Sequence, residues 1–258
     1  MKRKNAKTGK VYQRRSKTRI LRQSIQALIF LIAVILLIVI LKWDNNVPNE
    51  KEHREFDDEK ENMMEASEDF LLLVNRENPL PADYTVQLKK VQNQHQVDDR
   101  IAGYVTDMID NARKDGVELL ICSSYRSVSR QQELFNQEVD KYIAAGRSNN
   151  EAIAEAAFGV AVPGHSEHNT GLALDIVTPA YQRLDSGFEE TEAFGWLAKN
   201  AHKYGFILRY PKNKTHITKI KYEPWHYRFV GVEHARIIKD NGLTLEEYLD
   251  DRSNKGKN

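Results

Sequence analysis

The stretch PGHSEHNTGLALDI (residues 163–176) places two histidines and an aspartate where a loop passes into a predicted strand. Residues 159–170 are rich in Gly, Pro, His and Ser, a composition typical of a loop. Residues 171–177 alternate well enough to predict a strand. His168 lies in the loop and Asp175 in the strand. A hairpin-like return of the chain would bring both side chains to one point.

Short strands and helices alternate on both sides of this stretch. Apolar runs predict strands over residues 117–122, 206–210 and 222–230, and a strand or strap over residues 70–74. Helical spacing predicts a helix from Asp98 or Asp99 to Gly116, and further helices over residues 127–145, 150–158, 189–204, 233–239 and 245–249. We therefore expect an α+β fold, a single domain over residues 70–258 with a central, mostly antiparallel sheet flanked by helices.

The N-terminal part has a different character. Residues 1–22 contain ten Lys or Arg and no acidic residue, and residues 23–41 carry no charge. Nineteen residues roughly match the thickness of a bilayer core, and Lys42 and Trp43 suit a membrane boundary. We predict a basic cytoplasmic segment over residues 1–22 and one transmembrane helix over residues 23–43, with the rest of the chain outside the cell. A cleaved signal peptide and a buried core helix are the alternatives.

Residues 44–69 carry eleven acidic and three basic residues with few large apolar side chains. Such a composition buries too little apolar surface to repay the entropy of ordering, which predicts an extended acidic tether. A charged amphipathic helix over residues 50–69 is the alternative.

Charge and cysteine content exclude two classes of function. Outside the basic segment the chain has 28 basic and 37 acidic residues, a net charge of −9, which argues against a nucleic-acid-binding domain. The one cysteine, Cys122, cannot form an intrachain disulfide or a cysteine-rich zinc site. A metal would have to be held by histidines and carboxylates.

The residues for such a site are present. A catalytic zinc needs three protein ligands and one open position, and His168, Asp175 and His226 would supply the ligands. Glu223 lies three residues before His226, near enough to act as a general base on a metal-activated water. An isolated His or Asp is more often a hydrogen-bonding residue, and His165 is a competing ligand.

A second group of polar residues follows the strand that ends at Cys122. Arg126 lies between this strand and a helix, where its planar guanidinium would suit a carboxylate or a developing oxyanion. A structural salt bridge is the alternative. Ser124, Tyr125, Gln132 and Ser166 are further candidates for binding substrate, although the first three would equally serve packing and capping.

Four stretches together resemble a known family. They are SSYRS (123–127), PGHSEHNTGLALDI (163–176), YGFILRYP (204–211) and YEPWHYRFVG (222–231), and the resemblance covers the chain from about residue 70. They are similar to the zinc carboxypeptidases of bacterial cell-wall metabolism, the VanY-type D-alanyl-D-alanine carboxypeptidases and their L,D-carboxypeptidase relatives. The combination of His-x6-Asp with Glu-Pro-Trp-His is highly specific.

The resemblance implies one zinc per chain in a small α+β fold. It implies that His168, Asp175 and His226 are the metal ligands, that Glu223 is the catalytic base, and that Arg126 binds substrate and stabilises the transition state. His165 occupies a position that the family motif does not require, which favours the three-ligand assignment.

Two departures from the family pattern touch the pocket rim. Lys219-Ile220 stands where relatives usually have Gly-Tyr, and Asn169 where Gln is common. These changes bear on substrate preference and not on the metal.

The predicted anchor and the resemblance together lead us to expect a membrane-anchored, extracellular zinc metallopeptidase of a Gram-positive bacterium. It would remove the C-terminal D-alanine from peptidoglycan stem peptides or their precursors. A non-catalytic zinc-stabilised wall-binding module and a peptidoglycan endopeptidase are the alternatives, and both D,D and L,D specificity stay open.

Overall fold

The computed structural model describes residues 68–256. The predicted cytoplasmic segment, the predicted transmembrane helix and all but the last residues of the predicted tether lie outside the described residues. Within residues 68–256, no helix combines the length and the apolar character that crossing a bilayer requires.

Four antiparallel strands form the central sheet, in the order β3-β4-β6-β5. The strands are β3 (Leu120–Ser123), β4 (Ala173–Val177), β5 (Phe206–Tyr210) and β6 (Glu223–Phe229). The two middle strands, β4 and β6, are buried at every position. Both nevertheless contain charged or ionisable residues, and such groups are buried only where they are paired or bind a metal.

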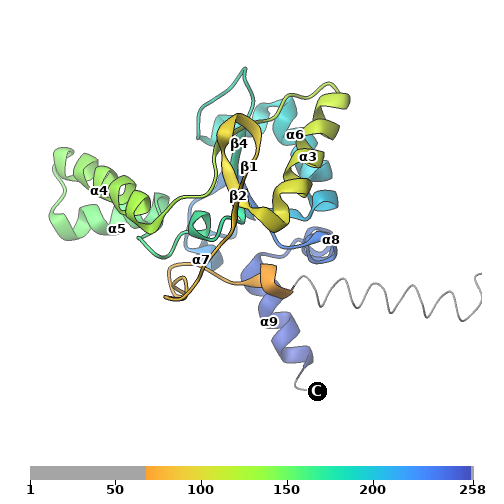
Figure 1. The fold of residues 1–258 in the computed structure, drawn as a ribbon. Helices are drawn as coiled ribbons and strands as arrows, with labels where there is room; N and C mark the ends of the chain where they lie inside the picture. The colour runs from red at the N-terminus through yellow and green to blue at the C-terminus, as the bar shows by residue number, and fades with distance from the viewer. Residues whose placement is uncertain (1–67, 257–258) are drawn as a thin grey trace, which may run out of the picture. The chain divides into compact units, whose positions relative to one another are not determined.

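Helices cover the side of the sheet that carries Tyr227. Figure 1 shows α3 (Ala102–Lys114) and α6 (Glu192–Asn200) next to each other beside the sheet. Their apolar faces pack with the strands into the largest core cluster, which includes Met108, Leu197, Phe206 and Phe229. Short 3-10 turns flank α6, namely η5 (Ser186–Glu190) and η6 (Ala201–Tyr204).

The C-terminal helices form a second, smaller core cluster. Helices α8 (Val232–Asn241) and α9 (Leu245–Lys255) pack Ile238, Leu245 and Tyr248 against Ile207 of β5. Thr244 caps α9 with a capping box, in which its hydroxyl accepts from the backbone of Glu247. This arrangement fixes where α9 begins, close to the edge strand β5.

Helices α4 (Val128–Ala144) and α5 (Asn149–Gly159) form a hairpin that projects from the sheet (Figure 1, left). The hairpin has an apolar cluster of its own, which includes Phe135, Val139 and Ala156. Ser127 caps α4 and Ser148 caps α5, so both predicted starts are correct to within one or two residues.

A small two-stranded sheet was not predicted. Strands β1 (Leu88–Lys90) and β2 (Gln96–Asp98) pair antiparallel around the turn η2 (Gln92–Gln94), where Asn93 has a left-handed φ of 54°. The Gln96 carbonyl accepts from the backbone of Tyr125, which attaches this hairpin to the chain after β3. A strand of three residues is too short for its alternation to stand out in the sequence.

The predicted α+β class with an antiparallel sheet is confirmed. The predicted helix over residues 189–204 is three consecutive pieces, because Thr191 is extended and caps α6. Residues 70–74 form no strand: the 3-10 turn η1 (Glu68–Leu71) leads into an irregular strap. Three further short elements are η3 (Asp99–Ile101), η4 (Glu167–Thr170) and α7 (Thr215–Thr218).

Candidate metal centre and active site

Two neighbouring strands and one loop bring three potential ligands together. Asp175 on β4 and His226 on β6 are directly paired in the sheet register. His168 lies in η4, which precedes β4 and ends at Gly171 in a left-handed conformation (φ 78°). A side chain at Gly171 would lie 2.9 Å from the backbone of Asp98, so this turn requires glycine.

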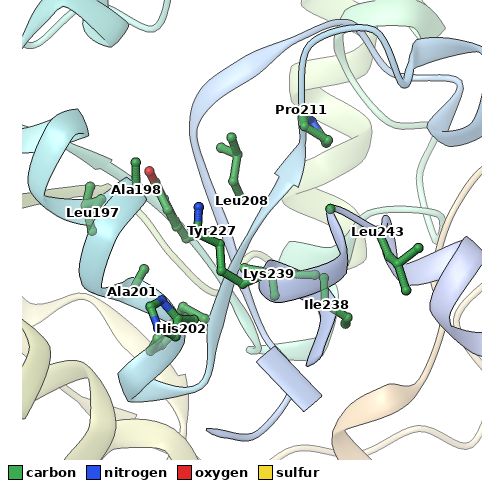
Figure 2. Close-up of a pocket in the computed structure, with 13 residues that line it drawn as sticks. Leu197, Ala198, Ala201, His202, Leu208, Pro211, Tyr227, Ile238, Lys239 and Leu243 are labelled. Atoms are coloured by element: carbon green, nitrogen blue, oxygen red, sulfur yellow. The ribbon is translucent and has the colours of Figure 1, made fainter. Parts of the chain in front are cut away.

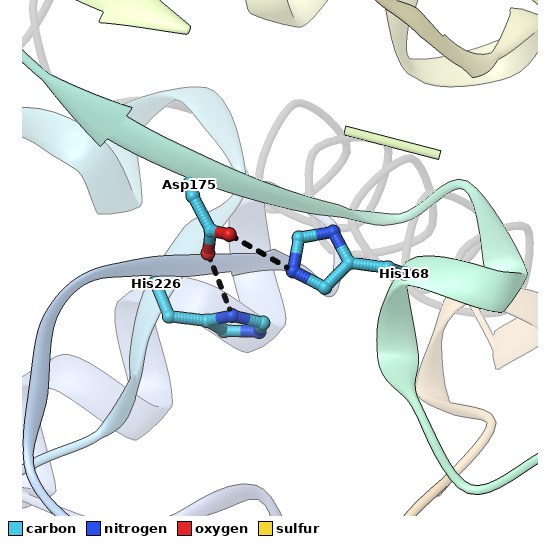
Figure 3. Close-up of side chains that lie close together, drawn as sticks. All are labelled: His168, Asp175 and His226. Carbon is cyan, nitrogen blue, oxygen red and sulfur yellow. Dashed lines mark hydrogen bonds and ion pairs between the residues drawn. The ribbon is translucent and has the colours of Figure 1, made fainter. Parts of the chain in front are cut away.

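The side chains of His168, Asp175 and His226, the trio that could hold a metal ion, point toward one another (Figure 3). Asp175 Oδ2 lies 3.3 Å from His168 Nε2, and Asp175 Oδ1 lies 3.0 Å from His226 Nδ1. One ligand atom from each residue lies within 4.8 Å of the other two, and all three residues are buried. The hairpin-like return that the sequence suggested for His168 and Asp175 is present.

The other ring nitrogen of each histidine has a partner outside the trio. His168 Nδ1 lies 2.7 Å from the backbone carbonyl oxygen of Ser124, and His226 Nε2 lies 3.4 Å from Glu167 Oε2. A carbonyl only accepts, so the proton of His168 is on Nδ1 and the lone pair of Nε2 faces the Asp175 carboxylate. The lone pair and the carboxylate oxygen repel each other unless a cation lies between them. Two histidine nitrogens and one carboxylate oxygen are also the donor set of a catalytic zinc site.

Burial and neighbouring charges shift the pKa values in the trio in different directions. Burial, together with the nearby Arg126, lowers the pKa of His168 to about 4. Burial also disfavours a charged His226, but hydrogen bonds to Asp175 and Glu167 outweigh it and raise the pKa of His226 to about 9. Burial opposes ionisation of Asp175 as well, yet the two histidines hold the pKa of its carboxyl well below the usual range.

Glu223 reaches the same point as the trio although it lies three residues before His226. Its Oε2 is 3.8 Å from His226 Nδ1, and the residue is buried. Regular strand geometry would put these two side chains on opposite faces. The β5–β6 register shifts between the Leu208–Tyr227 and Tyr210–Glu223 pairs, so the extra residues in β6 form an irregularity that turns Glu223 inward. Burial raises the pKa of the Glu223 carboxyl to about 7.

The trio and Glu223 lie in one pocket, the active-site pocket, of about 360 Å³. Arg126 also lines it, and its Nε is buried without a hydrogen-bond partner among the described residues. The Arg126 backbone is held on both sides: its N–H donates to the His168 carbonyl at 3.0 Å, and its carbonyl accepts from Asn169 Nδ2 at 2.7 Å. Burial lowers the pKa of Arg126, against the attraction of Asp175 and Glu223.

Asn169, one of the two departures from the family pattern, therefore acts on the backbone of Arg126 rather than at the rim. At the other departure, Lys219 has a left-handed φ of 59°, a conformation that favours glycine. Ile220 and Lys221 line the active-site pocket next to it.

Three predicted substrate-binding residues, Ser124, Tyr125 and Gln132, are not among the residues that line the active-site pocket. Gln132 is exposed on α4 and donates to Asn136 at 2.7 Å, so it does not reach the pocket. Its neighbour Gln131 is fully buried, lines the pocket and donates to the Ala161 carbonyl at 2.7 Å. Gln131 precedes the inward residues Phe135 and Val139 at spacings of four and eight, a signal that would have identified it.

Among the other candidates, Ser166 lines the active-site pocket, whereas Ser124, Tyr125 and His165 do not. Ser166 is also buried. Ser124 contributes its carbonyl to His168, while its hydroxyl lies 3.1 Å from His95. His165, the competing ligand, lies outside the trio, with its Nδ1 2.8 Å from the Asn75 carbonyl.

Glu167 is a residue of the site that the sequence reasoning missed. It lies between Ser166 and His168 in the motif, is 1% exposed, and contacts the ring of His226. Its place directly beside a predicted ligand was the available signal. The two arginines that donate to it, Arg209 on β5 and Arg228 on β6, are 42 and 61 residues away in the sequence.

A second pocket is mostly apolar and lies on the opposite face of β6. Tyr227 follows His226 and points away from the trio, into a space between α6, β5 and α8 that Leu197, Leu208 and Ile238 also line (Figure 2). Its hydroxyl is buried without a partner among residues 68–256. The lining of this pocket contains His202 and Lys239 but no carboxylate, whereas Asp175 and Glu223 line the active-site pocket on the other face.

Comparison with protein families gives a match to a known family. The sequence model of the family VanY, D-alanyl-D-alanine carboxypeptidase, matches residues 94–232. A D-alanyl-D-alanine carboxypeptidase of Enterococcus faecalis is 46% identical over 179 residues, which cover 69% of this chain and 65% of that protein. A D-alanyl-D-alanine carboxypeptidase of Enterococcus faecium is 32% identical over 235 residues, which cover 81% of this chain and 69% of that protein. The chain thus spans about two thirds of the length of these relatives.

Solved structures give the same result. A mutant VanY D,D-pentapeptidase from a VanB-type vancomycin resistance cassette, in complex with Zn(II), matches with a TM-score of 0.64 and 46% identity over 70% of this chain and 98% of that one. VanYB in complex with D-alanine-D-alanine matches with a TM-score of 0.66 and 46% identity over 71% and 98%. The LdcB LD-carboxypeptidase matches with a TM-score of 0.59 and 41% identity over 69% and 84%. These relatives support a zinc carboxypeptidase.

Proposed function

Because this chain belongs to the family of VanY-type D-alanyl-D-alanine carboxypeptidases, we propose that it removes the C-terminal D-alanine from peptidoglycan stem peptides. One observation carries the proposal: a buried carboxylate, Glu223, shares a pocket with the trio and with Arg126, whose Nε has no hydrogen-bond partner within residues 68–256. A metal-holding structural site would need neither Glu223 nor Arg126 in that position.

His168, Asp175 and His226 are the proposed zinc ligands. When bound there, zinc supplies Lewis acidity and makes a water molecule more acidic. The three ligands come from a sheet and from a loop tied to it, so the site is formed before metal binds. All three proposed ligands line the active-site pocket, which also contains Glu223, so a zinc held by them would be accessible from that pocket.

Glu223 is the proposed general base. It lies 3.8 Å from His226 Nδ1, on the pocket side of the trio, where it would accept a proton from the attacking water. It then passes that proton to the amine of the departing D-alanine. Because its carboxylate is not part of the trio, it is free to exchange the proton between these two partners.

Arg126 is the proposed partner for negative charge in the pocket. Its planar guanidinium has a buried Nε to which no other described residue is hydrogen-bonded, so it matches a carboxylate or a developing oxyanion. The backbone bonds to His168 and Asn169 hold Arg126 in a constant place relative to the trio. Ser166 and Gln131 are proposed to complete the substrate-binding surface.

The test is mass spectrometry of synthetic stem peptides after incubation with the full-length protein and zinc. Loss of one D-alanine from the pentapeptide supports a D,D-carboxypeptidase, and loss from the tetrapeptide supports an L,D-carboxypeptidase. Larger fragments identify an endopeptidase. Binding of peptide without any cleavage, at full zinc content, would refute the enzyme and leave the wall-binding module.

We also propose that the chain is anchored in the cell membrane by residues 23–43, with the catalytic domain outside. The ten basic residues before the uncharged stretch and Trp43 after it support this orientation. Such an anchor would hold the domain beside its substrate, the cell wall. Protease added to intact protoplasts should degrade the domain; a fully protected domain would overturn this orientation.

A further inference from the structure

Metal binding at the trio determines where His226 keeps its proton. The ring nitrogen that faces the trio is Nδ1, 3.0 Å from Asp175 Oδ1. A nitrogen that coordinates a metal has no proton, so the single N–H of a coordinating His226 must be on Nε2. The group next to Nε2 is Glu167, whose Oε2 lies 3.4 Å away.

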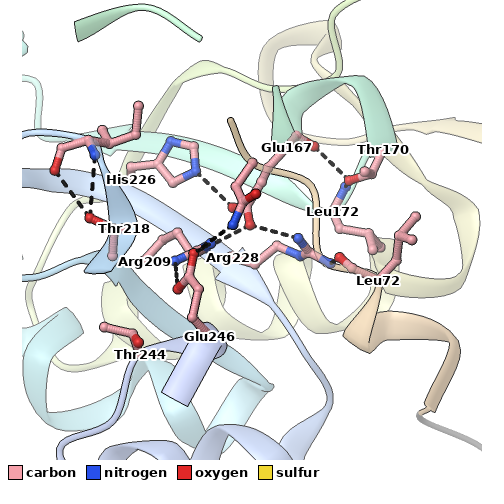
Figure 4. Close-up of polar contacts among 12 residues, drawn as sticks. Leu72, Glu167, Thr170, Leu172, Arg209, Thr218, His226, Arg228, Thr244 and Glu246 are labelled. Carbon is pink, nitrogen blue, oxygen red and sulfur yellow. Dashed lines mark hydrogen bonds and ion pairs between the residues drawn. The ribbon is translucent and has the colours of Figure 1, made fainter. Parts of the chain in front are cut away.

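Glu167 is held rigidly in this position. Its Oε1 accepts from Arg209 Nε at 2.7 Å and from Arg228 Nη1 at 2.8 Å, which leaves Oε2 directed at His226 (Figure 4). The side chains of Glu167, Arg209 and Arg228 are completely buried. With one oxygen fixed by two guanidinium groups, the carboxylate cannot turn away from the histidine ring.

The two arginines are in turn satisfied by groups from both ends of the described chain. Arg209 donates from Nη1 and Nη2 to Glu246 of α9, at 2.9 and 2.7 Å. Arg228 donates from Nη2 to the backbone carbonyls of Phe70 and Leu72 in the N-terminal strap, at 2.9 and 2.8 Å. Two arginines and two glutamates balance in charge, which is the condition for burying such groups.

We propose that Glu167 is a positioning residue of the metal centre. It accepts the Nε2 proton of His226, which keeps Nδ1 unprotonated and the ring oriented toward the metal, and Arg209 and Arg228 hold it there. A carboxylate behind a metal-bound histidine typically contributes 10- to 100-fold in metal affinity. The inference rests on the ligand assignment proposed above and not on the identity of the peptide substrate.

Glu246 provides the matched control. It is a second carboxylate on the same buried Arg209, at 2.7 Å, but it has no contact with the trio. If Glu167 served only to balance buried charge, replacing either glutamate would have the same kind of effect. If Glu167 positions His226, replacing Glu167 should weaken zinc affinity by more than its loss of stability explains. Replacing Glu246 should then lower stability without this additional loss of zinc affinity.

The experiment measures zinc affinity by competition with a chromogenic chelator, using the full chain and the variants Glu167→Asp, Glu167→Gln and Glu246→Gln. Glu167→Asp keeps the charge that the two arginines require but withdraws the carboxylate from His226, so it should fold even where Glu167→Gln does not. We expect zinc affinity to fall by about 10- to 100-fold in Glu167→Asp and to change by less than about twofold in Glu246→Gln.

A second measurement determines which ring nitrogen of His226 carries the proton. In zinc-loaded protein labelled with ¹⁵N-histidine, NMR should show the His226 proton on Nε2, and in Glu167→Asp this proton should exchange faster with water. A proton on Nδ1 would overturn the proposal, and so would equal zinc affinity in Glu167→Asp and the unmodified chain. Neither measurement requires D-alanine release, so failure of the proposed activity would be seen separately.

Discussion

Asp175 and His226 face each other across the two central strands, with Asp175 Oδ1 3.0 Å from His226 Nδ1. The pair is part of the hydrogen-bonded register of β4 and β6, so its separation is set by the sheet and not by a loop. Only His168 comes from irregular backbone, and its Nδ1 bond to the Ser124 carbonyl ties that segment to the chain after β3. This rigidity is what a preformed metal site requires, and the predictions below follow from it.

Glu223→Gln should separate catalysis from metal holding. Glu223 is not part of the trio, so zinc content should stay near one per chain while turnover falls by about 10² to 10⁴, the range for general acid–base catalysis. Atomic spectroscopy of the metal beside an assay of D-alanine release measures both. Zinc loss in this variant would make Glu223 a ligand, and unchanged turnover would refute its role as the base.

His168→Ala, Asp175→Ala and His226→Ala should each lose zinc and activity together, because two ligands are too few for a tight site. His165→Ala is the control from the same loop. Its Nδ1 is bonded to the Asn75 carbonyl and not to the trio, so this variant should retain its zinc. Full zinc content in any one of the three ligand variants would remove that residue from the assignment.

Tyr227→Phe should leave zinc content and turnover unchanged, although it adjoins His226. Its hydroxyl points into the apolar pocket on the other face of β6 and is buried without a partner among the described residues. Removing an unpaired buried hydroxyl should leave the free energy of unfolding equal or raise it by about 1–3 kcal/mol. Urea unfolding measures this change, and a large loss of stability or of zinc would show that the hydroxyl is bonded.

Glu246→Gln should destabilise the metal-free protein at neutral pH by about 1.5–3 kcal/mol, the value of a hydrogen bond to a charged group. Burial disfavours the charged Glu246, but Arg209 outweighs it and lowers the pKa of this carboxyl. A lowered pKa stabilises the fold above the unfolded value of about 4.3, and this contribution is lost as the pH falls through the folded value.

The difference in unfolding free energy between the unmodified chain and Glu246→Gln should therefore be largest near pH 7. It should narrow as the pH falls below about 4, where the carboxyl of Glu246 in the unfolded chain begins to take up its proton, and continue to narrow as the lowered folded pKa is passed. Urea titrations of both metal-free proteins across this range give the comparison. If this difference in unfolding free energy grew as the pH fell, the predicted stabilisation by ionised Glu246 would be contradicted.

A chain that begins at Ser67 should fold and bind zinc, because it retains the strap whose carbonyls at Phe70 and Leu72 accept from Arg228. A chain that begins at Arg76 loses these acceptors and the buried Leu71 and Val74, so it should be less stable by about 3 kcal/mol or more. Urea unfolding and zinc content of both truncations test the boundary. Equal stability of the two would show that the strap is dispensable.

The proposed ligands and the proposed base could be picked out of the sequence because each lies in a short motif, His-x6-Asp or Glu-Pro-Trp-His, that resembles the family. His168 and Asp175 lie at the end of a loop and in the strand that follows, and Glu223 and His226 lie within one strand. The alternation of apolar residues predicted these strands, and the antiparallel return of the chain follows from short connections. The α+β class could therefore be predicted from local pattern, whereas the meeting of Asp175 with His226, 51 residues away in the chain, depends on the pairing of β4 with β6.

Only the tertiary structure showed which neighbours hold these residues. Gln131 and Gln132 are adjacent residues of the same amino acid. The rotation of α4 about its axis points Gln131 into the active-site pocket and Gln132 toward solvent. The register shift in β6 turns Glu223 to the side of His226. Glu167 is held in position by hydrogen bonds from Arg209 and Arg228, which are 42 and 61 residues away in the chain. Contacts at that separation are decided by how the strands pack, and no local spacing in the sequence records them.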